Sequence, residues 1–327
     1  MTLGSEGNWS SQSSKVKWLK AVRATLTVGL IAILLILILQ QSVRAQIIDS
    51  IQSLSHLHIV FLTALFAVMR VVQALSLRHV LSLYNRQIDF KSALSLAGLK
   101  GLFNLGFSGL GLAAQSAQAR VQFLVPVRVM LFANVTQSFM LIVALGVCLF
   151  LATLFFFEAG VLPARIAFLG LALGAGLLGL LGVGICLFPN GLAKKVPNLK
   201  KLHSLLPPET TSKPTCRVVI GIIVLQIAFV VFRTARVLVI AYAIASAVNV
   251  EFLTVTVLAA DTLGVIQITP GGIGVRELII GALGATVEHY EVFLAAAIID
   301  RVMTVFFNIV HGSIAIWASG GQQYTAQ

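Results

Sequence analysis

The sequence is poor in charged residues. Asp, Glu, Lys and Arg make up only 10% of its 327 residues, whereas 58% are hydrophobic. A water-soluble domain needs about 25% charged residues to cover its surface. Together with a mean hydropathy of +0.98, this composition excludes an ordinary soluble fold and predicts an integral membrane protein. We therefore expect one membrane domain instead of the roughly two soluble domains that the length would otherwise favour.

Residues that support catalysis are also scarce. The three cysteines form no C-x-x-C pair and offer no metal site, the four aspartates form no D-x-D motif, and there is no nucleotide-binding loop. Metal-assisted group transfer needs grouped carboxylates. We therefore expect no enzyme activity, no metal and no cofactor. A membrane-embedded transferase acting on a lipid phosphate, or an accessory subunit of lipid or glycolipid biosynthesis, is kept as the alternative.

Six stretches are long and apolar enough to cross a hydrocarbon core about 30 Å thick. They are residues 20–39, 59–84, 128–157, 166–188, 217–248 and 290–317. The first resembles a secretory signal, but its length favours an uncleaved anchor that follows a cytoplasmic tail, residues 1–19. Two further apolar stretches, 92–124 and 252–287, are broken near the middle by glycines, so neither half can span. We expect two re-entrant helical hairpins, with pairs of kinked spans as the alternative.

The placement of basic residues predicts the orientation. With the N-terminus inside, thirteen Lys and Arg residues flank the cytoplasmic ends of the spans, whereas Arg44 and Arg165 alone lie at the outer ends. We therefore expect a plasma-membrane protein with both termini in the cytoplasm. The net charge of +12 then indicates a membrane surface and not a nucleic-acid partner.

The two halves of the sequence resemble each other, which indicates a duplication. Three pairs match in order: Phe66–Arg70 with Phe229–Arg233 at an offset of 163, Asp89-Phe90 with Glu251-Phe252 at 162, and Arg128–Met130 with Arg301–Met303 at 173. The last offset predicts about ten extra residues after the break in the second half.

The predicted repeats make up most of a single membrane domain, residues 20–327. Repeat 1 covers residues 59–157, repeat 2 covers residues 217–317, and the span 166–188 and the cytoplasmic loop 189–216 join them. Each repeat consists of a span, a hairpin and a span. The two spans of the first repeat and the one connecting span make an odd number of crossings, so the second repeat is inverted. Inverted repeats with broken helices are typical of secondary transporters.

The sharpest motif is the break of the second hairpin, Pro270-Gly271-Gly272-Ile273-Gly274-Val275-Arg276-Glu277. Glycines expose backbone N–H groups, and the N-terminus of the following helix attracts an anion. Arg276 in the first turn can add a bidentate clamp. We expect these glycines and Arg276 to bind a phosphate-sized head group. The alternative is that the glycines build the turn while Arg276 and Glu277 pair with neighbours.

Charges inside the apolar spans are the second signal, because each costs at least ~2.5–3.5 kcal/mol at a helix centre and normally faces the bundle interior. The arginines at this depth, which include Arg70, Arg233 and Arg236, outnumber the carboxylates. An anionic ligand would balance them, so we expect Arg233 and Arg236, one turn apart, to bind the head group. Four residues are candidates for proton coupling or for charge pairing: Asp261, Glu277, Asp300 and Arg301.

The first break is less polar, with Ala113 and Ala114 where the second has its Arg-Glu pair. We therefore expect asymmetric binding chemistry. Lys100, Arg120 and Arg128 near the first hairpin either serve a cytoplasmic mouth or mark the membrane boundary, and we favour the boundary.

The stretch Gly271–Glu277, after a proline and an apolar half-helix, is similar to the signature of the transmembrane region of the lysylphosphatidylglycerol synthase family. The segment layout and the Asp89-Phe90 start of the first hairpin extend the resemblance over nearly the whole membrane part. The resemblance implies lipid translocation by the membrane region, and aminoacyl transfer only by a separate soluble domain of some members. Because the sequence ends about ten residues after the last expected span, we expect that activity to be absent here.

These observations predict an all-α polytopic membrane protein of about six transmembrane helices and two re-entrant hairpins. We expect a flippase-like carrier of an anionic lipid, either a phospholipid or a polyprenyl-phosphate-linked lipid. The partners we expect are membrane lipids, with a second copy of the chain or an enzyme of lipid biosynthesis as protein partners.

Overall fold

The computed structural model describes Gln52 and residues 54–105, 109–156, 162–187, 216–245, 248–265, 275–287 and 290–323, and these residues form helices and turns without a strand. In chain order the elements are α3 (His56–Leu83), α4 (Phe90–Phe103), α5 (Leu110–Phe123), α6 (Val127–Phe156), α7 (Leu162–Leu187), α10 (Cys216–Ile244), α11 (Val250–Gly264), α12 (Val275–Gly284), the 3-10 turn η4 (Ala285–Val287) and α13 (Tyr290–Gln323). The all-α prediction is confirmed.

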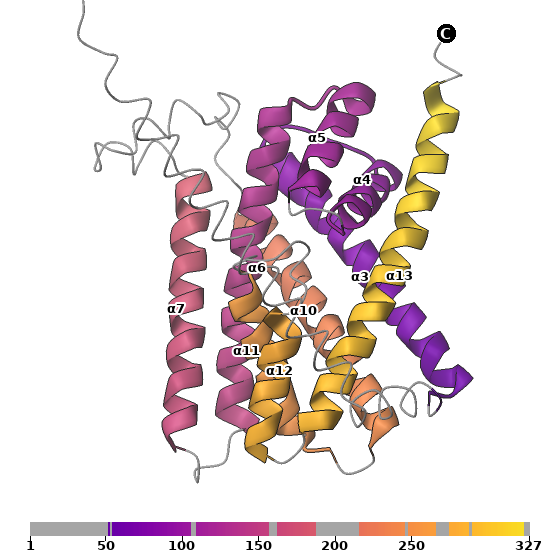
Figure 1. The fold of residues 1–327 in the computed structure, drawn as a ribbon. Coiled ribbons are helices and arrows are strands. Elements are labelled where there is room, and N and C mark those ends of the chain that lie inside the picture. The colour runs from indigo at the N-terminus through magenta and orange to yellow at the C-terminus, as the bar shows by residue number, and fades with distance from the viewer. Residues whose placement is uncertain are drawn as a thin grey trace, which may run out of the picture.

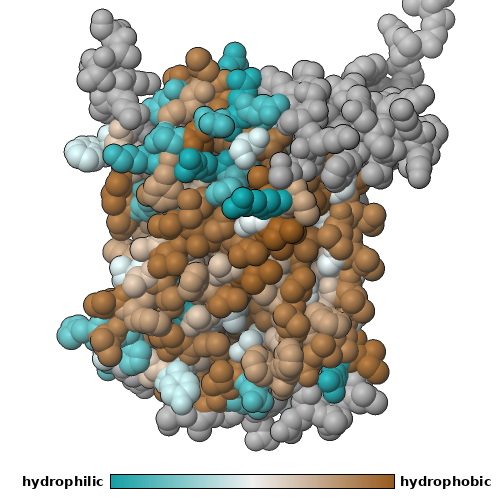
Figure 2. All heavy atoms as spheres, turned by 180° about the vertical axis from the view of Figure 1, so that it is seen from behind, coloured by the Kyte–Doolittle hydropathy of each residue, from teal (hydrophilic) through white to brown (hydrophobic). Residues whose placement is uncertain are grey.

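Among the described residues, five helices are long and apolar enough to cross a membrane. The spans within them are His56–Leu83, Val127–Phe156, Ala164–Leu187, Cys216–Ile244 and Glu291–Ala318. They correspond to five of the six expected spans. The sixth, residues 20–39, lies outside the described residues, as do the tail 1–19 and the loop up to residue 215. Figure 2 shows hydrophobic residues in a broad belt, with hydrophilic residues gathered at the end that carries α4 and α5.

The two glycine-broken stretches form pairs of short, packed helices. α4 and α5 have 14 residues each, and α11 and α12 have 15 and 10. A 14-residue helix is about 21 Å long and cannot cross the hydrocarbon core. Gly109 precedes α5 with φ +103°, a conformation that favours glycine. In Figure 1 the α4–α5 pair occupies the upper end of the bundle and the α11–α12 pair reaches the lower end, as two hairpins entering from opposite sides require.

The first hairpin begins at a side-chain cap. The carboxylate of Asp89 accepts a hydrogen bond from the backbone N–H of Ser92 at 3.3 Å and another from the Ser92 hydroxyl. These bonds, chiefly the one from the hydroxyl, hold the pKa of Asp89 below its ordinary value. In the second half Asn249 caps α11 in the same way, through the N–H of Phe252 at 2.8 Å.

Loss of this cap is expected to destabilise the first hairpin. Asp89→Ala should lower the stability by about 0.5–2 kcal/mol, whereas Asp89→Asn should retain most of it, because Asn caps nearly as well. The pKa of Asp89 is lower in the folded protein than in the unfolded chain. The charge of Asp89 therefore stabilises the fold above the ordinary aspartate pKa of about 3.9, and this stabilisation is lost as the pH falls through the lower folded pKa. Thermal unfolding of purified protein at several pH values measures both effects. Equal stability of the Ala and Asn variants would contradict the cap.

The helices of the two halves correspond. α3 and α10 begin at His56 and Cys216, 160 residues apart, and α4 and α11 begin at Phe90 and Val250, also 160 apart. α6 and α13 begin at Val127 and Tyr290, 163 apart. The expected match of Arg128–Met130 with Arg301–Met303 is therefore wrong in register, because Arg128 is the second residue of α6 while Arg301 lies well inside α13. The extra residues of the second half lie in the break itself, 265–274 against 104–109, and not after it.

The packing follows the same symmetry. α3 packs against its counterpart α10, α4 packs against α13, and, equivalently, α11 packs against α6. Each hairpin thus lies on the last long helix of the other half. Figure 1 shows α3 and α10 running in opposite directions, so the two halves are inverted.

The connecting helix α7 lies outside this arrangement and packs mainly on α6. The two helices approach closely at Gly146, where an added Cβ would lie 2.8 Å from the carbonyl oxygen of Ala172 and 2.8 Å from the backbone nitrogen of Gly176. Small residues allow such approach between membrane helices. The opposite face of α7 is largely exposed apolar surface, which includes Leu173, Leu177 and Leu181.

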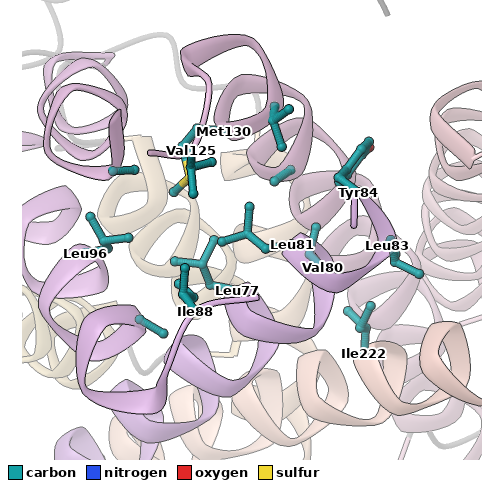
Figure 3. Close-up of a cluster of buried hydrophobic side chains, with 14 of the residues drawn as sticks. Leu77, Val80, Leu81, Leu83, Tyr84, Ile88, Leu96, Val125, Met130 and Ile222 are labelled. Atoms are coloured by element: carbon teal, nitrogen blue, oxygen red, sulfur yellow. The ribbon is translucent and has the colours of Figure 1, made fainter. Parts of the chain in front are cut away.

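A buried apolar cluster fixes the first hairpin on the long helices. Leu77 and Leu81 of α3, Leu96 of α4, Met130 of α6 and Ile222 of α10 all belong to it, and Figure 3 shows these side chains converging. The fully buried Tyr84 adds a polar tie, because its hydroxyl forms a 2.6 Å hydrogen bond with that of Thr136 on α6. The cluster therefore sets the position of α4, and with it the position of the polar residues that α4 carries.

Candidate functional site

A cavity of about 630 Å³ lies where the two helix breaks meet. The first break contributes Asn104 and Gly109 to its lining, and the second contributes Gly264 and Val265. The long helices α3, α6, α10 and α13 supply most of the remaining wall. Both hairpins therefore take part in one site. The break glycines predicted to bind the head group, Gly271, Gly272 and Gly274, lie outside the described residues.

The described lining of this cavity is strongly basic. Its six cationic side chains are Arg70, Lys100, Arg233, Arg236, Arg276 and Arg301, and its carboxylates are Asp261 and Asp300. Buried charges are costly unless they are paired. The contacts of each cation therefore decide which of them can serve a ligand.

Five of these charged residues form one alternating ion-pair cluster: Arg233, Asp261, Arg276, Asp300 and Arg236. Arg276 bridges the two carboxylates, with its Nε 2.5 Å from Asp261 Oδ1 and its Nη1 2.9 Å from Asp300 Oδ2. Arg236 Nη2 lies 2.7 Å from Asp300 Oδ1, and Arg233 Nη2 lies 2.9 Å from Asp261 Oδ1. The cluster has three cations and two anions, and it ties together α10, α11, α12 and α13.

The cluster changes the role predicted for Arg276. Two of its nitrogens are held by Asp261 and Asp300, and its side chain is only 6% exposed. The alternative that Arg276 pairs with neighbours therefore describes these contacts, whereas phosphate binding by Arg276 stays a prediction. Asp261 and Asp300 pair with arginines, which is one of the two roles predicted for them, the other being proton coupling. Arg233 is the accessible end of the cluster, with 30% of its side chain exposed.

Arg236 is the buried end of the cluster. Its side chain is 5% exposed and also donates a hydrogen bond to Thr304 Oγ1 at 2.6 Å. Glu277 is 1% exposed and lies outside the described cavity lining, whereas Arg301 is part of it. The site therefore brings together all the predicted charged residues except Glu277, with Arg236 and Arg276 almost fully enclosed in the ion-pair cluster.

Arg70 and Lys100 are held by uncharged groups. Arg70 donates to Gln73 Oε1 at 2.8 Å and to the side-chain oxygen of Asn308, and its guanidinium lies 4.6 Å from the ring centroid of Phe66. Lys100 donates to Asn134 Oδ1 at 2.6 Å. Within the part of the chain that the structure describes, no carboxylate pairs with either cation. Among the described residues that line the cavity, the charge of these two side chains is thus uncompensated.

The position of Lys100 corrects the sequence interpretation. We favoured a residue at the membrane boundary, but its amino group reaches Asn134 on α6 and lines the cavity. Arg120 is exposed, and neither it nor Arg128 belongs to the cavity lining described. The first hairpin therefore contributes polar side chains to the site, although its break is less polar than the second.

The amide side chains of the site were not predicted from the sequence. Asn104, which follows the last residue of α4, Asn134 of α6 and Asn308 of α13 line the cavity. Polar residues in membrane helices usually face other helices and hydrogen-bond across them. The available signal was therefore a carboxamide in an otherwise apolar run, such as Asn134 in the span 128–157.

A family model described as the Lysylphosphatidylglycerol synthase TM region matches residues 24–312. The chain belongs to this family. Neither a curated protein nor a solved structure matches the chain. Membership confirms the resemblance drawn from the second break and places the chain among membrane proteins of lipid modification or transport. The match includes both halves, so the whole described cavity lies within the family's region.

Proposed function

We propose that this protein moves an anionic lipid between the leaflets of the plasma membrane and binds its phosphate head group in the cavity between the two hairpins. The observation that carries the proposal is the charge of Arg70 and Lys100, which among the described residues is met by amides and one aromatic ring and by no carboxylate. A head-group phosphate supplies the missing negative charge and hydrogen-bond acceptors. Arg233, at the accessible end of the ion-pair cluster, is the third contact.

The architecture supports a carrier. The helix breaks of two inverted halves line one cavity, which is the arrangement in which rocking of one half against the other exposes a site alternately to each side. The lipid tails stay in the hydrocarbon while only the head group crosses. The sequence contains no nucleotide-binding loop, so we propose an ion gradient or the lipid gradient as the energy source, with Asp261 as a candidate for proton coupling.

The orientation is part of the proposal. We place the end that carries α4, α5 and the end of α13 on the cytoplasmic side. Arg78 and Lys91, two of the thirteen residues that predict this sidedness, are exposed near the α3–α4 connection. Lys and Arg accumulate on the cytoplasmic side of membrane proteins.

A liposome assay tests the function. The purified full-length protein is reconstituted with trace labelled phosphatidic acid or phosphatidylcholine, and head-group accessibility on the outer surface is followed over time. We expect phosphatidic acid to be moved at least about tenfold faster than phosphatidylcholine, since one charge-assisted hydrogen bond contributes about 1.5–3 kcal/mol. Rates equal to those of protein-free liposomes, or equal rates for both lipids, would overturn the proposal.

A further inference from the structure

His311 continues a polar stripe of α13 beyond the cavity. Asp300, Thr304 and Asn308 line the cavity from one face of this helix. His311 follows Asn308 by three residues and therefore lies on the same face. In Figure 1 this part of α13 runs beside α4, toward the end that we place in the cytoplasm. His311 thus lies about one helical turn from the cavity, on its cytoplasmic side.

Two glycines of α4 let the ring of His311 and the guanidinium of Arg70 approach the same stretch of that helix. A Cβ added at Gly98 would lie 3.2 Å from His311 Cδ2. One added at Gly101 would lie 2.9 Å from Asn308 Oδ1 and 3.2 Å from Arg70 Nη1. The ring and the guanidinium therefore occupy successive turns of one helix–helix contact, and Arg70 interacts electrostatically with His311.

One ring nitrogen of His311 is unused. Its Nδ1 is buried and has no hydrogen-bond partner among the residues that the structure describes, whereas Nδ1 of His79 lies 2.7 Å from the carbonyl oxygen of Leu75. No described carboxylate forms an ion pair with His311 either. Histidine is the side chain that ordinarily gains and loses a proton between about pH 5 and 8. His311 is therefore a titratable group beside the cavity to which a proton can add at Nδ1 without breaking a described hydrogen bond.

The charged residues of the helices around α13 leave Arg70 as the one that acts on His311. The helices packed against α13 are α4, α10 and α12, and their described charged residues are Lys91, Lys100, Arg217, Arg233, Arg236, Arg276 and Glu277. Arg236 and Arg276 meet α13 at Asp300, eleven residues before His311 and so about 16 Å away along the helix axis. Arg233 belongs to the same ion-pair cluster, and Glu277 interacts with the adjacent Arg301. Lys100 is held by Asn134 of α6, and Lys91 and Arg217 are exposed in the first turns of their helices.

The charge of Arg70 couples proton binding at His311 to anion binding in the cavity. A proton on His311 adds a second positive charge beside Arg70, which like-charge repulsion opposes. A phosphate bound at Arg70 supplies negative charge and removes this opposition. The proton and the anion therefore favour each other's binding, and the coupling is the same in both directions.

We propose that His311 is a proton-binding site that fills when the head-group phosphate occupies the cavity, so that a proton and the anionic head group cross the membrane together. The proton adds to an imidazole nitrogen from the cytoplasmic side, offsets one negative charge of the lipid, and is released on the other side when the phosphate leaves. The transport part of this inference rests on the proposed function, whereas the binding part can be measured without transport. Asp261 is less suited to this role, because Arg233 and Arg276 hold its carboxylate as an ion.

Calorimetry of the purified full-length chain with short-chain phosphatidylglycerol tests the binding, because this phosphodiester keeps one negative charge over the range of pH used. Titrations in two buffers of different ionisation enthalpy count the protons taken up. Between about pH 4.5 and 8 we expect a maximum of at least about 0.3 proton per bound lipid, and the affinity should rise at least about threefold as the pH falls, since typical coupling is fivefold or more and part of it lies in this range. In His311→Gln both effects should disappear.

His79→Gln is the matched control. His79 is also half-buried, but it lies nine residues after Arg70 on α3, about 13 Å along the helix, and this variant should keep the proton uptake. NMR of the wild-type chain with labelled histidines guards against misfolding of His311→Gln, because one ring should take up its proton at a higher pH when the lipid is bound. No proton uptake by the wild type, equal uptake by His311→Gln, or no change of any histidine ring would each overturn the inference.

Liposomes with a pH gradient separate this inference from the proposed function. We expect labelled phosphatidylglycerol to move at least about twofold faster from the acidic side to the alkaline side than in reverse, because the proton and the anion cross together. His311→Gln should show no such difference. Movement that ignores the gradient in the wild type would overturn the inference and leave the proposed function standing. Proton uptake on binding without movement of any lipid would overturn the function and leave the proton site standing, and neither uptake nor movement would overturn both.

Discussion

Removal of the two uncompensated cations, Arg70→Gln together with Lys100→Met, is expected to slow translocation of phosphatidic acid by about 100-fold or more. Each cation contributes a charge-assisted hydrogen bond of about 1.5–3 kcal/mol to a bound phosphate, and tenfold in a constant corresponds to 1.4 kcal/mol. The stability should not fall, because neither cation pairs with a carboxylate in the described structure. Liposome rates and thermal unfolding of the same preparations measure the two effects.

The chain offers a matched control for this variant. Arg78→Gln with Lys91→Met removes the same two charges from the same two helices, but at exposed positions outside the cavity. Its rate should stay within about twofold of the wild type. A similar loss in both variants would show that overall charge matters and not the cavity. Unchanged translocation rates in both variants would show that Arg70 and Lys100 do not bind the head group.

Loss of one aspartate from the ion-pair cluster is expected to have the largest effect on stability. Asp300→Asn leaves Arg236, with a side chain 5% exposed, without its carboxylate partner in the described structure, and it removes one of the two carboxylates that Arg276 contacts there. Removal of one partner from a buried ion pair costs about 3–5 kcal/mol because the other charge stays buried. We expect a corresponding fall in the unfolding temperature of the purified protein.

A double variant tests whether the charge imbalance causes this loss. Asp300→Asn combined with Arg236→Met removes one charge of each sign, so it should be more stable than Asp300→Asn alone by at least about 1 kcal/mol. Asp89→Asn, which changes an exposed carboxylate, is the control and should stay close to the wild type. A double variant as unstable as the sum of its two single variants would show that the cluster stabilises the fold only through packing.

Local properties of the chain predicted most of the fold. The hydropathy averaged over each span predicted the long helices. Glycines inside an apolar stretch, such as Gly109, predicted the helix breaks. The inversion followed from the odd number of spans between the hairpins. The predicted alignment of Arg128–Met130 with Arg301–Met303 was wrong, because an identity of three residues is too short to fix a position along a helix.

The sequence by itself determined that this is a membrane protein of two inverted halves with more buried cations than anions, because these properties depend on composition and on local periodicity. Only the tertiary structure decided which cations are neutralised. Arg236 meets Asp300 across 64 residues, and Arg70 meets Asn308 across 238. Such pairs depend on the rotation and packing of whole helices. For that reason Arg276 is enclosed by two aspartates, while amide side chains hold Arg70 and Lys100, the two cations of the proposed head-group site.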